Sequence, residues 1–197
     1  MSAPQPLPDA GADALAGGFA NPAHDSARAF RAILTAMARP GTIREVAAGS
    51  GPAPLSPAAA SVLLVLCDRT TPLYVAPGHD SPALRDWIAF HCACPLVGPG
   101  EAAFALGDWA GLASLDAVFA AGTPEYPDRS VTLIVDGHDF DAPPARLRGP
   151  GIRGEAHLAL PDPAAFRRNH ARFPLGWDAI LTSGGRLAAL PRSTEIG

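Results

Sequence analysis

The stretch over residues 173–194 constrains the fold of this chain most, because it specifies a β-hairpin with a defined start and a defined end. Its opening Phe-Pro-Leu-Gly predicts a turn, since proline fixes φ and glycine adds conformational freedom. The runs 177–182 and 186–190 are typical of strands, and the glycine pair between them is typical of a tight turn. Pro191 ends the second strand because it has no N–H for the ladder. The sequence therefore predicts an antiparallel hairpin that is at least half buried.

Two polar residues stand at the ends of this hairpin, Asp178 and Arg192. A carboxylate among apolar strand residues needs a partner when it is buried. Arg192, across the hairpin, is the obvious partner, and it is also our preferred contact for an anionic ligand. The sequence leaves both roles of Arg192 open.

Upstream of the hairpin, helix and strand signals alternate. Helices that begin with proline are predicted over residues 22–39, 57–67, 82–91 and 163–170. Short strands are predicted at 43–47, 72–76, 95–97, 102–106, 131–135 and 145–148, with a helical turn at 115–120. This order predicts one α/β domain over residues 21–197, with three layers and a mixed central sheet, behind a flexible leader over residues 1–20.

The first predicted helix has an apolar and a basic side. At 100° per residue the arginines gather on one arc together with Thr35, and the large apolar residues gather on the opposite arc. We therefore expect the apolar residues to face the core: Ala27, Phe30, Ile33, Leu34 and Met37.

All 15 basic residues are arginine. Without lysine the chain has no Schiff-base lysine, no general-base lysine and no Gly-x-x-x-x-Gly-Lys phosphate loop. No apolar run approaches the roughly 20 residues of a membrane span and no N-terminal signal segment is recognisable, so a cytoplasmic protein without membrane contact is expected. The net charge of −4 and the lack of interleaved basic and aromatic residues disfavour nucleic acid as a partner.

The charge is unevenly distributed along the chain. Residues 1–144 carry a net charge of −8, whereas residues 145–192 carry +5. An arginine-rich third of this kind suits an anionic small ligand or an acidic partner surface. The alternative is a solvated face without a ligand.

Two further features each admit two interpretations. Gly149-Pro150-Gly151 follows a predicted strand, and it either bends the chain or directs backbone N–H groups at an anion. The bend is favoured because proline removes one donor. His91 lies on the apolar side of its helix, which favours a hydrogen-bonded core histidine over a catalytic base.

The three cysteines, Cys67, Cys92 and Cys94, are too few for a disulfide framework. Their spacing fits thiols in a core or at a loop edge better than a metal site, because Cys-x-Cys is not a common zinc spacing. No nucleophile, base and orienting residue form a complete set, so we predict neither a catalytic residue nor a metal ligand.

Several phrases together resemble one protein family. They are HDSARAFRAILTAMARPG, SVLLVLCDRTTP, FHCACPLV, GTPEYPD before VTLIV, LRGPGI and FPLGWDAILTSGGRLAALPRST. In this order and spacing, over residues 19–194, they are similar to the PhnH family, whose members belong to the bacterial carbon–phosphorus lyase core complex of phosphonate degradation.

The resemblance implies a fold like that of type I pyridoxal-phosphate transferases, but without that cofactor, which agrees with the missing lysine. It implies a homodimer when the protein is alone, and assembly with subunits G, I and J in the complex. Without assigning catalytic roles, it carries over these positions as candidate ligand contacts: Arg31, Arg39, Gly41, His91, Gly149, Gly151, Asp178 and Arg192.

Two functional hypotheses follow. The first is an assisting, non-catalytic subunit that is needed with subunits G, I and L to form ribose 1-phosphonate 5-triphosphate from ATP and an alkylphosphonate. The alternative is a small-anion binding module that grips a phosphonate or nucleotide with the arginine-rich C-terminal third.

Overall fold

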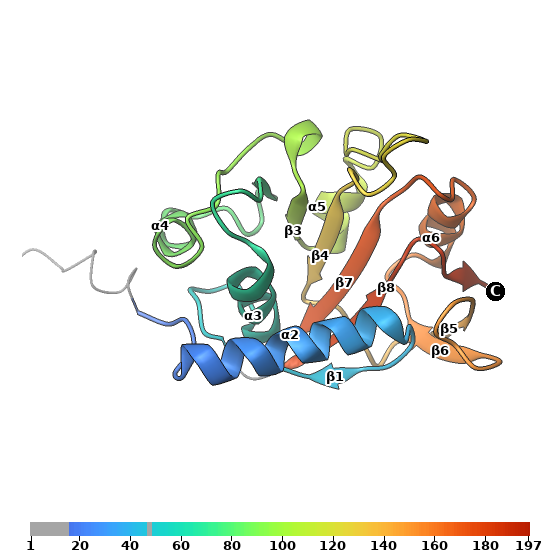
Figure 1. The fold of residues 1–197 in the computed structure, drawn as a ribbon, viewed down its shortest axis with the longest axis horizontal. Coiled ribbons are helices and arrows are strands. Elements are labelled where there is room, and N and C mark those ends of the chain that lie inside the picture. The colour runs from blue at the N-terminus through green and yellow to red at the C-terminus, as the bar shows by residue number, and fades with distance from the viewer. Residues whose placement is uncertain (1–15, 47–48) are drawn as a thin grey trace, which may run out of the picture.

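The computed structural model describes residues 16–46 and 49–197. Its main sheet has six strands in the order β1-β8-β7-β4-β3-β2 (Figure 1). Their bounds are β1 Arg44–Glu45, β2 Leu73–Val75, β3 Phe104–Gly107, β4 Thr132–Asp136, β7 Asp178–Ser183 and β8 Arg186–Leu190. Strands β2, β3, β4 and β7 run parallel, while β8 and β1 are antiparallel to their neighbours, so the sheet is mixed as predicted.

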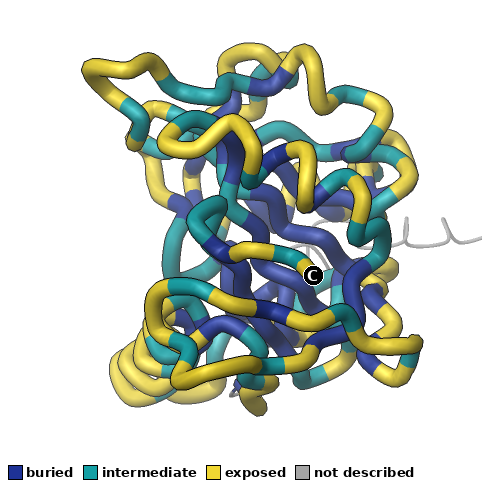
Figure 2. The backbone as a smooth tube through the Cα atoms, turned by 90° about the vertical axis from the view of Figure 1, so that its right-hand side faces the viewer, coloured by how far each residue is buried: buried dark blue, intermediate teal, exposed yellow. Residues whose placement is uncertain are grey.

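The C-terminal hairpin forms as the sequence predicts. Strands β7 and β8 pair from Ala179↔Leu190 to Ser183↔Arg186. Gly184 in the turn has a φ of +55°, a left-handed conformation that glycine adopts without strain. Eight of the eleven strand residues of the hairpin are buried, and Figure 2 shows buried backbone gathered in the middle of the molecule.

Helices cover both faces of this sheet. Their bounds are α2 Pro22–Ala38, α3 Pro57–Leu66, α4 Pro82–His91, α5 Trp109–Ala113 and α6 Pro163–His170, with one 3₁₀ turn, η1 Pro99–Glu101. Alternate residues of the strands point to opposite layers. Ile134 and Ile180 join the core under α2, α3 and α4, whereas Leu133 and Leu181 join the core under α5 and α6. The three-layer prediction is therefore confirmed. None of these helices is long and apolar enough to cross a membrane.

A second, smaller sheet was not predicted as such. Strand β5 Pro144–Arg148 pairs antiparallel with β6 Ala156–Ala159 and with β9 Glu195–Ile196. The strand predicted at 95–97 is only an isolated bridge between Leu96 and Leu73. Helix α5, β6 and β9, of five, four and two residues, were not predicted.

The prediction for the buried face of α2 is correct for Ile33 and Met37, which join the core, and wrong for Ala27, Phe30 and Leu34, which are exposed. The helix buries Ala29, Ile33 and Ala36, while Phe30 and Leu34 are 50% and 56% exposed. The small alanine side chains let the helix axis approach α3 and β8 closely, and this contact sets the rotation of the helix. The large apolar residues dominate the hydrophobic pattern, so the face predicted from the sequence is rotated by about a quarter turn from the face that is buried.

The N-terminal leader is only partly described. Residues 1–15 of the expected leader lie outside the described residues. The rest is not a free segment, because Gly18 and Ser50 exchange backbone hydrogen bonds of 2.8 and 3.0 Å, and Phe19 packs against the core.

Candidate functional site

The eight predicted ligand residues do not come together in one place. Asp178 and Arg192 form one cluster, and their predicted ion pair is confirmed: Arg192 Nη2 lies 2.6 Å from Asp178 Oδ2, and Nε lies 3.1 Å from Oδ1. Arg192 also donates from Nη1 to the Pro127 carbonyl at 2.7 Å and from Nη2 to Ser130 Oγ. The guanidinium ties the hairpin to the loop before β4. An anionic ligand would have to displace these partners.

A second cluster brings the Gly149-Pro150-Gly151 corner against the end of α2. Gly151 has a φ of +80°, and a Cβ there would lie 2.1 Å from the Ala38 carbonyl oxygen. Gly41, which follows Arg39 and Pro40, has a φ of +90°, and a Cβ there would lie 2.6 Å from Ala156 Cβ. These close approaches support the bend interpretation of the corner. Arg31 lies further along α2, in a separate groove.

His91 lies apart from both clusters, and within the described part of the chain it makes no hydrogen bond. Its ring packs on Trp87 and Phe90, each with ring centroids 4.9 Å away, and its Nε2 is buried without a partner. The hydrogen bond expected for a core histidine is therefore absent, because aromatic rings surround the imidazole at the end of α4.

The three cysteines are free and buried, so the prediction of core thiols is confirmed. Hydrogen bonds from the thiols of Cys67 and Cys92 hold the pKa of Cys94 below its usual range, and the same contacts raise the pKa of Cys67 and Cys92. Within the described residues no group of three or more His, Cys, Asp and Glu side chains could hold a metal ion.

The polar cluster with the most buried charge was missed by sequence reasoning. It is centred on Asp136, the last residue of β4, which is 3% exposed. Oδ1 of Asp136 accepts from Thr182 Oγ1 at 2.9 Å and from the Gly137 N–H at 3.0 Å. Oδ2 accepts from the Ser56 N–H at 2.9 Å and lies 3.4 Å from His79 Nε2. Four segments far apart in the sequence meet on this carboxylate.

Electrostatics keep Asp136 ionised. Burial by itself raises the pKa of this carboxyl, but the hydrogen bonds from His79, Ser56 and Thr182 outweigh it and hold the pKa below its usual value. His79 is buried as well, and its Nδ1 has no hydrogen-bond partner. Nearby, burial lowers the pKa of His138, whose Nε2 lies 3.1 Å from the Ala159 carbonyl oxygen. His138 is therefore neutral at pH 7.

A cavity of about 280 Å³ lies beside this cluster, where the parallel strands β3 and β4 end. In open α/β sheets, ligands bind outside the carboxyl ends of parallel strands, which makes this the default location for a site. Its polar lining is acidic, with Asp108, Asp136 and Asp139 against the neutral His138. An acidic cavity repels a phosphonate or a triphosphate, so the pocket does not suit an anionic substrate.

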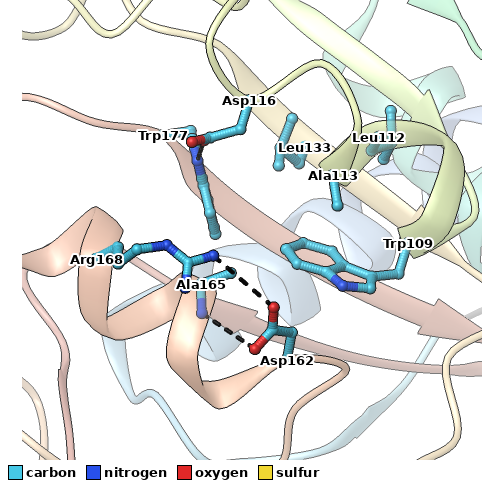
Figure 3. A pocket seen from close by; sticks show the side chains of 9 residues that line it. All are labelled: Trp109, Leu112, Ala113, Asp116, Leu133, Asp162, Ala165, Arg168 and Trp177. Carbon is cyan, nitrogen blue, oxygen red and sulfur yellow. Dashed lines mark hydrogen bonds and ion pairs between the residues drawn. The ribbon is translucent and has the colours of Figure 1, made fainter.

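Trp109 also lines a smaller cavity of about 50 Å³ (Figure 3). Trp109 and Trp177 face each other across it, with Leu133 and Leu112 behind them. Trp177 Nε1 donates to Asp116 Oδ1 at 2.6 Å, and at the rim Arg168 lies 3.9 Å from Asp162. This volume holds a few water molecules and no nucleotide. Trp109 and Trp177 therefore form part of the core next to the cavity beside Asp136.

One sequence signal could have located the Asp136 cluster. The buried run 131–135 is followed at once by Asp-Gly-His-Asp, which places carboxylates and a histidine where a strand ends. The contributions of His79 and Ser56 have no such signal, because they lie 57 and 80 residues away from Asp136.

Comparison with known proteins decides the family. The model of the family described as bacterial phosphonate metabolism protein (PhnH) matches residues 17–197. The chain belongs to the PhnH family. It is 37% identical over 191 residues to the alpha-D-ribose 1-methylphosphonate 5-triphosphate synthase subunit PhnH of Rhizobium meliloti (strain 1021), covering 91% of this chain and 94% of the relative. It is 32% identical over 181 residues to the putative C-P lyase subunit protein HtxG of Stutzerimonas stutzeri, covering 85% and 84%. The resemblance found in the sequence is confirmed.

The arginine-rich C-terminal third gives little support to the small-anion hypothesis. Seven of its eight arginines already contact acidic side chains or backbone carbonyls, namely Arg146, Arg148, Arg167, Arg168, Arg172, Arg186 and Arg192. Only Arg153 has no such contact in the described part of the chain. Six of the eight arginines of this third therefore lie beside a carboxylate of the protein.

Proposed function

We propose that this chain is an assisting, non-catalytic subunit of a complex of the carbon–phosphorus lyase type. In that complex it works with subunits G, I and L to form ribose 1-phosphonate 5-triphosphate from ATP and an alkylphosphonate. The observation that carries the proposal is the family match over residues 17–197, together with a relative of almost the same length that is named as a subunit of such a synthase.

The chemistry of the site supports an assisting role. Displacing adenine from ATP joins two anions, the phosphonate and the triphosphate, and this requires cationic groups or a metal around them. The cavity at the carboxyl ends of β3 and β4 carries carboxylates instead. Most arginines of the C-terminal third already have protein partners. The reacting groups are therefore assigned to other subunits.

Several finer features belong to the same proposal. We place the protein in the cytoplasm, as a homodimer when alone and with subunits G, I and J as partners in the complex. The likeness to type I pyridoxal-phosphate transferases stays a prediction, and so does the absence of that cofactor. A chain without lysine offers no amine for the internal aldimine of pyridoxal phosphate.

The test is co-expression of this chain with the G, J and tagged I subunits from the same source, followed by size exclusion. We expect co-elution at a fixed ratio. Adenine release from ATP and methylphosphonate is then measured with G, I and L, with and without this chain. Release should need this chain, and the chain alone should release none. Elution as a separate species at micromolar concentration, or adenine release by the purified chain alone, would contradict the proposal.

A further inference from the structure

The outward side of α2 exposes large apolar side chains that the fold does not use. Phe30 and Leu34 are 50% and 56% exposed, and Ile43, just before β1, is 43% exposed. Helix α2 and β1 run side by side along the lower edge of the molecule in Figure 1. We call Phe30, Arg31, Leu34, Ile43 and Arg44 the α2 surface. Burying these large apolar side chains in an assembly would remove them from water, so their exposure indicates a contact surface.

The same surface holds positive charge without a partner. In the described part of the chain, five arginine side chains have no ion pair, hydrogen bond or ring contact: Arg31, Arg39, Arg44, Arg69 and Arg153. Three of them lie on α2, at its end, or on β1. Arg28, the remaining arginine of α2, pairs with Asp25 at 3.1 Å. A chain with a net charge of −4 thus keeps three of these five arginines on or next to α2 and β1, beside exposed apolar residues.

Between α2 and β1 the surface is hollowed. A groove of about 590 Å³ is lined by Arg28, Arg31, Thr35, Ile43, Arg44 and Glu45. Strand β1 stands at the end of the sheet order, and among the described residues it pairs only with β8, so no described strand covers its other edge. A protruding side chain or an extended segment of another protein fits such a groove.

We propose that the α2 surface docks another subunit of the complex, through a patch on that subunit that is apolar at its centre and acidic at its rim. The proposal rests on the proposed function and adds the surface. The apolar residues Phe30 and Leu34 would supply the desolvated centre, and Arg31 and Arg44 the charge complementarity. A free phosphonate or triphosphate would use the arginines but leave the two large apolar side chains in water.

A second copy of this chain is the wrong partner for this surface. In a twofold-symmetric contact the same patch meets itself, so a surface with Arg31 and Arg44 would meet a surface that carries the same two positive charges. Like charges in a desolvated contact disfavour association. A homodimer, if it forms, uses another surface.

The experiment measures the affinity of purified variants for an immobilised complex of subunits G, I and J. Phe30→Ala/Leu34→Ala and Arg31→Glu/Arg44→Glu should each weaken binding at least tenfold, roughly the loss of one good contact. The matched controls are Phe90→Ala, an exposed phenylalanine on α4 (59%), and Arg153→Glu, a free arginine elsewhere in the described chain. Both controls should bind like the wild type. Raising the salt from about 50 to 300 mM should weaken wild-type binding, because screening acts on exposed charges.

The outcomes separate this inference from the proposed function. If the wild type does not bind the subunits, the proposed function fails and the inference fails with it. If the wild type binds and both double variants bind equally well, the function stands and the docking surface is overturned. Loss of self-association alone would make the surface a homodimer contact. Loss of inorganic triphosphate binding in Arg31→Glu/Arg44→Glu, with subunit binding intact, would make it an anion site. Either result overturns the proposal. Equal unfolding free energies of all variants confirm that the comparison concerns binding.

Discussion

Arg192→Ala should destabilise the fold by about 3 kcal/mol, because its side chain links three segments. The change removes two contacts to Asp178, of 2.6 and 3.1 Å, one of 2.7 Å to the Pro127 carbonyl, and one to Ser130. Breaking a fully buried ion pair costs about 3–5 kcal/mol. The lower end applies here, since the Asp178 side chain is 24% exposed and keeps the hydrogen bond from the Arg192 N–H at 2.8 Å.

Urea unfolding of Arg192→Ala and wild type measures this loss directly, and the melting temperature should fall by roughly 6–12 °C. Arg153→Ala is the matched control and should stay within about 0.5 kcal/mol of wild type, because the Arg153 side chain has no partner in the described part of the fold. A double-mutant cycle with Asp178→Asn isolates the pairwise energy between the two side chains. Arg192→Lys should recover only part of the loss, since an ammonium cannot reproduce the planar fork. If Arg192→Ala is as stable as the control, the hairpin is not anchored through this guanidinium, and a role in ligand binding becomes the better explanation.

Three further predictions follow from the core. Hydrogen bonds hold the pKa of Asp136 below its value in the unfolded chain, so the stability that they contribute is full above about pH 4 and declines as the pH falls through the folded pKa. Asp136→Asn should therefore make the unfolding free energy depend less on pH in the acid range. An unchanged pH dependence would refute the assignment. Gly151→Ala should lower the unfolding free energy by about 1–3 kcal/mol more than Gly154→Ala, as measured by chemical denaturation. The two glycines have similar φ, +80° and +79°, but only at Gly151 would a Cβ meet a backbone oxygen, at 2.1 Å. Equal losses would show that the backbone around Gly151 shifts to accept the methyl group. The three buried thiols, each 6% exposed, should react with a thiol reagent only on unfolding, and rapid labelling of the native protein would contradict their place in the core.

Local signals in the sequence predicted much of the fold correctly. The side chains of Asn21, Ser56 and Ser81 accept hydrogen bonds from the first turns of α2, α3 and α4, so the three predicted starts are real caps. The ion pair of Asp178 and Arg192 was also predictable, because a hairpin places its two ends side by side. These features act over a few residues or across one tight turn.

The candidate site was predictable only in fragments. Asp136 follows a buried strand, which marks it as a residue at a strand end, but its partners come from three other segments. The arginines of the α2 surface are recognised as unpaired only in the structure, because only the structure shows which of the other arginines form ion pairs. The arginine-rich composition of residues 145–192 suggested a ligand site, but in the structure most of these arginines contact groups of the protein itself.

The sequence by itself determined most of the order of helices and strands, the hairpin and the family, because caps, turns and alternation are encoded in neighbouring residues. The tertiary structure alone decided which side of α2 is buried and what surrounds Asp136. The rotation of a helix depends on how closely its backbone can approach the sheet, and small alanines permit an approach that Phe30 and Leu34 would prevent. Such packing joins residues that are distant in the chain, and no local pattern records it.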